Sequence, residues 1–212
     1  MEAAGVLERL RHVRWIGGGS GGGKSTIARR LAEERGWRLY PTDDVMGDHS
    51  RRSTETDAPL LSAFRAMDMD ERWLLRSPEV MLETFHWFRG EGFGLIVEDL
   101  LALPDTTTVI VEGFRLLPEL VHPLLTRREH AVWLLPTPEF RRAVFERRGS
   151  LWKIAGQTSD PNAALRNLLR RDGMFTDRLT VQVQALGLLA IELDTTVREG
   201  DLTDRIGAFF SA

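Results

Sequence analysis

The chain has 212 residues, a formal net charge of -3 and no cysteine. Its length suits a single α/β domain with a sizeable core, and the absence of cysteine excludes disulfides and thiolate metal sites. The slightly acidic balance gives no general reason to expect a nucleic-acid partner. Because no apolar run is long enough to cross a membrane and the first residues do not resemble a signal peptide, we expect a cytoplasmic protein without membrane contact.

A glycine-rich stretch follows the first predicted strand, which covers His12–Ile16. From Gly18 it matches G-x-x-x-x-G-K-[ST], the pattern of a phosphate-binding loop (P-loop). Apolar residues at helical spacing come next, and Gly36 is typical of a helix C-cap. A flexible glycine linker is the alternative. A linker, however, has no reason to place lysine, serine and threonine at this spacing between a strand and an amphipathic helix.

The predicted loop has the side chains that a nucleotide triphosphate and Mg²⁺ require. Glycines let the backbone turn its N–H groups towards an anion. Lys24 supplies a positive charge for the β- and γ-phosphates, Ser25 offers a hydroxyl to Mg²⁺, and Thr26 can reach a phosphate oxygen. The predicted nucleotide-binding residues are Gly18, Gly19, Ser20, Gly21, Gly22, Gly23, Lys24, Ser25 and Thr26.

The next part of the chain is predicted to contain a short strand followed by a long helical region. A strand is expected at Trp37–Tyr40, and Thr42–Asp44 follow it, at the edge where open parallel sheets hold ligands. Residues 48–57 are polar and predict a loop. Residues 54–104 have helical patterns and six aromatic residues, which we expect to be mostly core, with one or two lining an apolar pocket. These are Phe64, Trp73, Phe85, Trp87, Phe88 and Phe93.

The third predicted strand, Thr107–Val111, is short, apolar and β-branched, as buried parallel strands are, and it leads into Glu112. P-loop proteins place a carboxylate that helps to hold Mg²⁺ at this point, directly or through water. A solvated acid at the end of a strand is the alternative. We predict Ser25 and Glu112 as the metal-binding residues. Histidines 49, 86 and 122 lack metal-ligand spacing and receive no predicted role.

Two more strands are expected, at His130–Leu135 and Leu188–Leu193. Helices are expected from Pro138, from Pro161 and over Leu202–Phe210. Strands that alternate with helices predict a right-handed, doubly wound sheet of five parallel strands flanked by helices, in one α/β domain over residues 1–212.

Together these motifs resemble the P-loop small-molecule kinases, a group that includes nucleotide, gluconate, shikimate and chloramphenicol kinases. The resemblance rests on Gly18–Thr26, Thr42–Asp44, Val109–Gly113 and the arginine-rich segment 141–171. It implies the P-loop NTPase fold and an ATP-dependent phosphotransferase that moves a γ-phosphoryl group to a hydroxyl of a small molecule. It also implies that residues 54–104 are a helical acceptor-site insertion.

Asp43 matches the aspartate that in this group contacts the acceptor hydroxyl, so the resemblance makes it the acceptor base. Asp44 is the rival, and a plain Asx turn is a further alternative. The group often has an arginine three residues later, where this chain has Met46. Arg51 and Arg52 are the candidate replacements.

The resemblance also implies a lid that closes over the phosphates, and residues 147–172 are the candidate. We expect Arg147 and Arg170 to contact phosphate, although a solvated helix surface is the alternative for each arginine of this segment. A mobile lid would remove water and so suppress hydrolysis of ATP.

Two other functions are compatible with a P-loop. A nucleotide-dependent switch or regulatory ATPase is one, but the N/T-K-x-D motif that reads guanine is missing. A nucleotide or nucleic-acid 5′-hydroxyl kinase is the other, and for a nucleic-acid strand it would need a basic groove. The predicted partner is a small hydroxylated molecule, and the sequence leaves the oligomeric state open.

Overall fold

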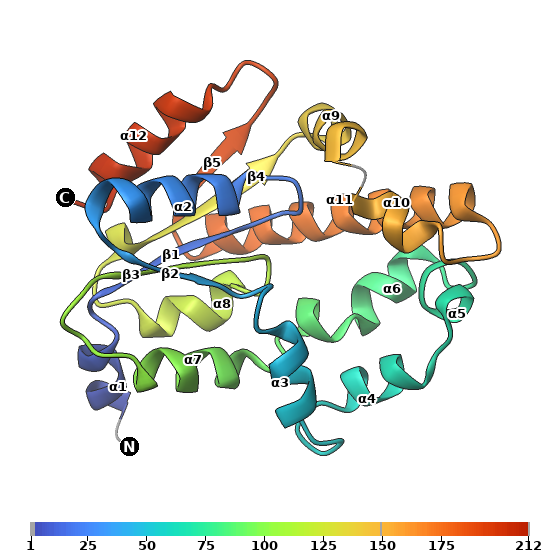
Figure 1. Cartoon of the computed structure of the whole chain (residues 1–212), viewed down its shortest axis with the longest axis horizontal. Helices are drawn as coiled ribbons and strands as arrows, with labels where there is room; N and C mark the ends of the chain where they lie inside the picture. The colour runs from blue at the N-terminus through green and yellow to red at the C-terminus, as the bar shows by residue number, and fades with distance from the viewer. Residues whose placement is uncertain (1–2, 149, 212) are drawn as a thin grey trace.

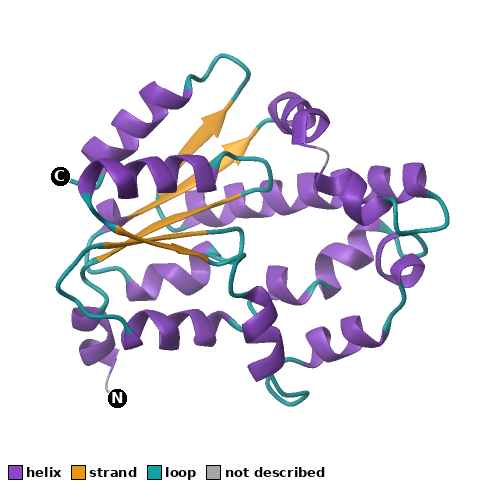
Figure 2. Cartoon of the chain, in the orientation of Figure 1, coloured by secondary structure: helices purple, strands orange, loops and turns teal. Residues whose placement is uncertain are grey.

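The structure, a computed structural model, describes residues 3–148 and 150–211, with side chains for 5–144 and 153–211. Five parallel strands form one sheet in the order β2-β3-β1-β4-β5 (Figure 1, Figure 2). They are β1 (Val13–Gly18), β2 (Arg38–Pro41), β3 (Val109–Glu112), β4 (Ala131–Pro136) and β5 (Leu189–Leu193). Their ends lie within two residues of the predicted ranges, so the predicted parallel sheet is confirmed.

Helices cover both faces of the sheet. One face packs on α2 (Lys24–Arg35) and α12 (Glu199–Phe209), and the other on α7 (Phe93–Ala102), α8 (Pro118–Val121) and α11 (Pro161–Ala185) (Figure 1). Side chains alternate between the faces, so that Ile16 and Ile110 meet α2 while Trp15 and Val111 lie on the other side. Since both faces are buried, β3 and β4 are apolar along most of their length.

The chain changes direction across the sheet at β1. From this central strand it proceeds to β2 and β3 on one side, and then to β4 and β5 on the other. In open α/β sheets ligands bind outside the carboxyl ends of the strands at such a switch point. The loop that follows Gly18 lies there.

A group of short helices lies beyond the carboxyl ends of the strands (Figure 1). They are α3 (Met46–Arg52), α4 (Pro59–Ala66), α5 (Met69–Trp73), α6 (Pro78–Thr84), the 3₁₀ turn η1 (His86–Arg89) and α10 (Ser150–Ala155). Three of them, α5, α6 and α10, contact α11, whose first turns extend past the sheet.

The remaining elements connect the strands. They are α1 (Ala3–Arg9), the 3₁₀ turns η2 (His122–Leu124) and η3 (Arg128–His130), and α9 (Pro138–Arg148). Within the described residues, no helix combines the length and the hydropathy that a membrane crossing requires.

The predicted loop at residues 48–57 is wrong in its first half, because α3 covers Met46–Arg52. The helix has a buried side, but hydropathy does not reveal it because the buried residue is polar. It buries His49 completely, and the His49 side chain is held by Asp99 of α7. A polar tertiary contact therefore stabilises a segment that has few apolar residues.

Candidate functional site

The loop between β1 and α2 has a backbone that glycine permits. Gly18, Gly21 and Gly23 have φ angles of 131°, 78° and 70°. A Cβ atom on Gly18 would lie 2.1 Å from the Leu134 carbonyl oxygen of β4, so no side chain fits there. Gly23 is the N-cap of α2 in the left-handed conformation. The glycines thus form a tight turn that packs against β4 and leads into the start of a helix.

Lys24 is the first residue of α2 and is only 8% exposed. Its Nζ atom donates a hydrogen bond of 2.8 Å to the Gly19 carbonyl oxygen, which lies across the loop. The N-terminus of α2 is the positive end of the helix dipole. Lysine and helix together give the loop the electrostatic character of a phosphate site.

Glu112 ends β3 and is 3% exposed. Burial raises the pKa of its carboxyl group, while Lys24 and a hydrogen bond from the Ser25 hydroxyl act in the opposite direction. The two predicted metal-binding residues are therefore neighbours. In the described residues no group of three or more histidine or acidic side chains could hold a metal ion alone. Mg²⁺ is commonly bound by one or two carboxylates plus substrate phosphates and water, and Ser25 with Glu112 fits that pattern.

Asp43 lies two residues beyond the end of β2 and lines a cavity together with Lys24, Ser25 and Glu112. The residue is accessible to solvent, but the surrounding protein still raises the pKa of its carboxyl group, and Lys24 and Arg115 oppose this shift. Asp44 is also exposed but does not line the cavity. The structure therefore brings Asp43, rather than its neighbour, to the cavity beside the glycine-rich loop.

This cavity has a volume of about 390 Å³, with the glycine-rich loop on one side and aromatic rings on another. The rings belong to Phe64, Trp73, Phe85, Trp87, Phe88 and Phe114. Trp73, Trp87, Phe88 and Phe93 are buried in hydrophobic clusters, so the prediction that most of the six aromatic residues are core is confirmed. All of the six except Phe93 also line the cavity, where one or two were expected. The prediction underestimated their number because α6 ends at Thr84, and the consecutive aromatic residues that follow turn towards the cavity.

A second cavity, of about 350 Å³, lies beside the same glycines. Gly21, Gly22 and Gly23 line both cavities. The wall of the second one comes from α2, α9, the end of β5, the segment that follows it and the start of α12. Its apolar members are Ile27, Phe140, Val144, Leu193, Val197 and Leu202. The loop thus separates two cavities, which the sequence did not predict.

Arg115 is a buried cation behind the cavity, 2% exposed. It donates to the carbonyl oxygens of Thr42 at 3.3 Å and Gly92 at 3.1 Å, and its guanidinium lies 4.0 Å from the ring centre of Trp87. Burial lowers the pKa of Arg115 to about 10, although Tyr40, Asp43 and Asp99 oppose the shift. Because Thr42 directly precedes Asp43, Arg115 holds the turn that positions this aspartate.

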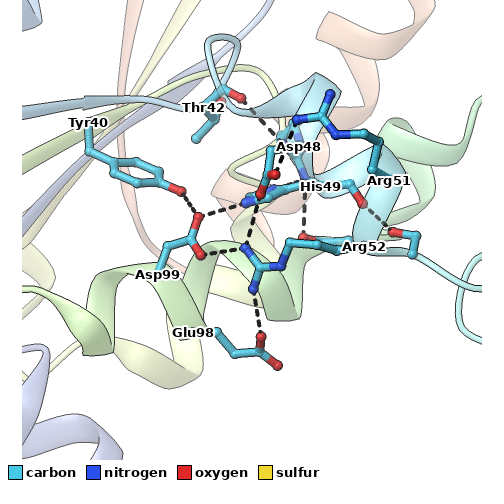
Figure 3. A network of polar contacts seen from close by, with 11 residues as sticks. Tyr40, Thr42, Asp48, His49, Arg51, Arg52, Glu98 and Asp99 are labelled. Atoms are coloured by element: carbon cyan, nitrogen blue, oxygen red, sulfur yellow. Dashed lines mark hydrogen bonds and ion pairs between the residues drawn. The ribbon is translucent and has the colours of Figure 1, made fainter.

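His49 connects Arg115 to Asp99. Arginine only donates hydrogen bonds, so Nδ1 of His49 must accept the 3.0 Å contact from Nη2 of Arg115. Nε2 then carries a proton and donates to Asp99 at 2.8 Å. Figure 3 shows Tyr40 and Arg52 bonded to the same carboxylate, each at 2.7 Å.

Sequence reasoning missed Arg115, His49 and Asp99. Their spacing matches no motif, and the contacts between them join residues that are distant in the chain. One signal was present: Arg115 is a lone charge in the apolar run Phe114–Leu117. A charged residue in such a run is seldom buried unless it has partners.

Of the two predicted lid arginines, the structure describes the side chain of Arg170 only, and it does not line the cavity. The side chain of Arg147 lies outside the part that the structure describes. Arg170 is exposed and pairs with Glu79 at 2.8 Å, away from the cavity. Its neighbour Arg171 is 5% exposed and lines the cavity instead.

The candidate replacements for the arginine missing at position 46 do not line the cavity either. Arg51 contacts Asp48, and Arg52 is bonded to Asp99. Met46 itself is part of the cavity wall.

No family model matches the chain, and no curated protein matches it. Among solved structures, the chain is similar to one described as "uncharacterized protein from Eubacterium ventriosum ATCC 27560". The two share 16% sequence identity with a TM-score of 0.48, and the match covers 94% of this chain and 97% of that one.

Proposed function

We propose that the protein is an ATP-dependent phosphotransferase of the P-loop NTPase fold that phosphorylates a hydroxyl group of a small molecule. The observation that carries the proposal is the convergence of Lys24, Asp43 and the Ser25–Glu112 pair on one cavity. The second cavity lies on the other side of Gly21–Gly23. Its position supports a reaction in which two substrates bind on either side of the loop and meet there. A regulatory ATPase would have no use for an acceptor cavity with a carboxylate beside the phosphate site.

Each residue has a separate task in this proposal. The backbone N–H groups of the loop and Lys24 would hold the phosphates, and Ser25 with Glu112 would hold Mg²⁺. Bound Mg·ATP supplies the phosphoryl group and part of the neutralising charge. Asp43 would orient the acceptor hydroxyl and take up its proton, which is general-base catalysis. Phosphoryl transfer otherwise needs mainly positioning and charge neutralisation.

The helices around the cavity would exclude water. Ile154 of α10 and Arg171 and Asp172 of α11 line the cavity, and all three belong to the lid candidate 147–172. Exclusion of water would suppress hydrolysis of ATP, so that the phosphoryl group is transferred to the acceptor.

The test is calorimetric titration of Mg·ATP into wild type, Lys24→Ala and Lys153→Ala. Lys153 is a matched control because it is the chain's other lysine and is exposed on α10. Loss of a charge-assisted hydrogen bond predicts roughly tenfold weaker binding or more for Lys24→Ala. Lys153→Ala should bind like wild type. Equal affinities in all three proteins would rule out the loop as the nucleotide site.

A further inference from the structure

The aromatic wall of the P-loop cavity is a packed array of rings. The centre of the Phe64 ring is 5.2 Å from that of Trp73 and 5.6 Å from that of Phe85, with near-perpendicular planes. The ring centres of Phe88 and Phe114 are 5.7 Å apart and also perpendicular. Mutual edge-to-face contacts fix the rings, so the wall is formed before any ligand enters. The volume of the cavity suits a small ligand with an apolar body.

Arg171 lines the cavity, and its guanidinium lies about 5 Å from the ring centres of Trp73, Phe85 and Phe88. Nε and Nη2 both donate to Oδ1 of Asp172, at 2.9 and 2.6 Å. Nη1 is buried and has no partner. Asp172 offsets the positive charge, so the pair offers an N–H group rather than a net cation. A buried donor without a partner is costly, and a ligand atom that accepts from it recovers that cost.

His86 is the second polar group of the wall and is 2% exposed. Its Nδ1 atom is also buried without a partner. Burial, followed by the nearby charges of Arg115, Arg65 and Arg72, lowers the pKa of His86 to about 3, so the ring is neutral near pH 7. A neutral imidazole adds hydrogen-bonding capacity to the cavity but no charge.

We infer that the acceptor is an aryl or similarly apolar alcohol that carries an uncharged oxygen acceptor, such as a carbonyl, away from its reactive hydroxyl. This inference rests on the proposed function. The hydroxyl would lie at Asp43, the apolar body against the rings, and the carbonyl at Nη1 of Arg171.

The same lining disfavours two common classes of acceptor. A sugar would leave several hydroxyls unpaired against the rings, which is costly. A nucleoside monophosphate would bring a dianion into the cavity. Among the described lining residues, the cations are Lys24, which we assign to the nucleotide, and Arg171, which Asp172 neutralises.

The test compares two aryl alcohols that differ in one oxygen atom, 4-acetylbenzyl alcohol and 4-ethylbenzyl alcohol, with glucose and thymidine monophosphate. Binding is followed by protein fluorescence, because Trp73 and Trp87 line the cavity. Transfer is followed with γ-labelled ATP. Both aryl alcohols should bind and accept phosphate, the acetyl compound roughly tenfold more tightly because it pairs with Nη1. Glucose and thymidine monophosphate should do neither.

The double variant Arg171→Met/Asp172→Asn removes the donor without leaving a buried lone carboxylate, and it should abolish the tenfold preference for the acetyl group. Arg178→Met is the matched control, since Arg178 lies on the same helix but pairs with Glu83. Arg171→Lys keeps a cation beside Asp172 and serves as a second variant if the double one unfolds. It should also lose most of the preference.

The outcomes separate the inference from the proposed function. The inference about the acceptor is overturned if neither aryl alcohol binds at millimolar concentration, or if glucose or thymidine monophosphate is the better acceptor. The proposed phosphotransferase function is retained in both cases. An unchanged preference in the Arg171 variants also overturns the inference. If the aryl alcohols bind but Mg·ATP does not, the proposed function fails while the ligand class of the cavity is retained.

Discussion

The turn after β2 presents two adjacent aspartates in different surroundings, and Asp43 is the one that lines the cavity. We predict that Asp43→Asn, which keeps the shape of the side chain but removes the base, lowers turnover of the true acceptor by roughly 10²–10⁴-fold. Affinity for Mg·ATP should change little, because the P-loop is untouched. Steady-state kinetics and calorimetry measure the two effects.

Asp44→Asn is the matched control for this substitution and should keep near wild-type turnover. If Asp44→Asn loses activity while Asp43→Asn keeps it, the roles of the two residues are reversed. If both variants stay active, the pair only forms the turn, and another residue holds the acceptor.

The raised pKa of Asp43 makes a further prediction for wild type. Only the ionised carboxyl group accepts a proton, so turnover should fall as the pH decreases through this pKa. Because the pKa is raised, the loss should begin at a higher pH than for an ordinary aspartate. A pH–rate profile that stays flat down to the range of a free aspartate would contradict the raised pKa of Asp43.

The pKa of Asp99 is shifted in the opposite direction to that of Asp43. Burial alone would raise its pKa, but hydrogen bonds from Tyr40, Arg52 and His49 outweigh burial and lower the pKa to about 2. A lowered pKa means that the folded state prefers the ionised form, so the stabilisation is complete above pH about 4 and is lost towards pH about 2. The shift from 3.8 corresponds to a contribution of about 2 kcal/mol.

We therefore predict that Asp99→Asn lowers the free energy of unfolding by about 2 kcal/mol near neutral pH, and by less near pH 3. Urea unfolding at the two pH values measures the difference. Asp48→Asn is the control, because the Asp48 carboxylate is half exposed in its contact with Arg52 and should contribute under about 1 kcal/mol. Equal losses at both pH values would mean that ionisation of Asp99 is not the source of the stability.

At the level of secondary-structure elements, the ends of β2 and β3 meet at Gly113. Its φ angle is 154°, and a Cβ atom there would lie 1.7 Å from the Thr42 hydroxyl oxygen. Gly113→Ala must displace Thr42, and with it the turn that carries Asp43. We predict a loss of about 1–3 kcal/mol in unfolding free energy, together with lower turnover.

Gly94 is the control for this substitution, because it lies within α7 and a Cβ atom on it has nothing within 4 Å. Gly94→Ala should stabilise the protein by about 0.5–1 kcal/mol, since alanine favours a helix over glycine. Thermal unfolding compares the two variants. If Gly113→Ala is as stable as wild type, the strand ends are more adaptable than the close contact indicates.

The elements differ in how well the sequence predicts them, and the difference follows from the range of the interactions involved. β3 and β4 are apolar runs, and the loop between β1 and α2 is a local pattern of glycines with Lys24, so a window of ten residues contains the relevant information. α3 is stabilised by His49 and Asp99, which are fifty residues apart. No local pattern could reveal that pair, nor the number of aromatic rings that face the cavity.

For the molecule as a whole, the lid candidate 147–172 is attached to the helical region 54–104. Ser159 donates to Asp70 through its backbone N–H and its hydroxyl, at 2.7 and 2.5 Å. Asn167 donates to the Leu74 carbonyl oxygen at 3.1 Å. These contacts join the segment to α5 and the residue that follows it, rather than to the P-loop. The segment and α5 are therefore expected to move together, around the cavity that they share.

Hydrogen exchange tests this motion. We predict that amides of residues 153–160 and of α5 exchange more slowly when an ATP analogue, Mg²⁺ and an acceptor are all bound, because closure over the cavity suppresses local opening. The ATP analogue alone should protect the loop Gly18–Thr26 but not α5, since α5 contributes to the cavity lined by Asp43 and not to the cavity on the other side of the loop. Amides of β4 serve as the internal control and should not change. Protection of 153–160 without protection of α5 would show that the lid moves alone, and protection of neither would remove the lid from the mechanism.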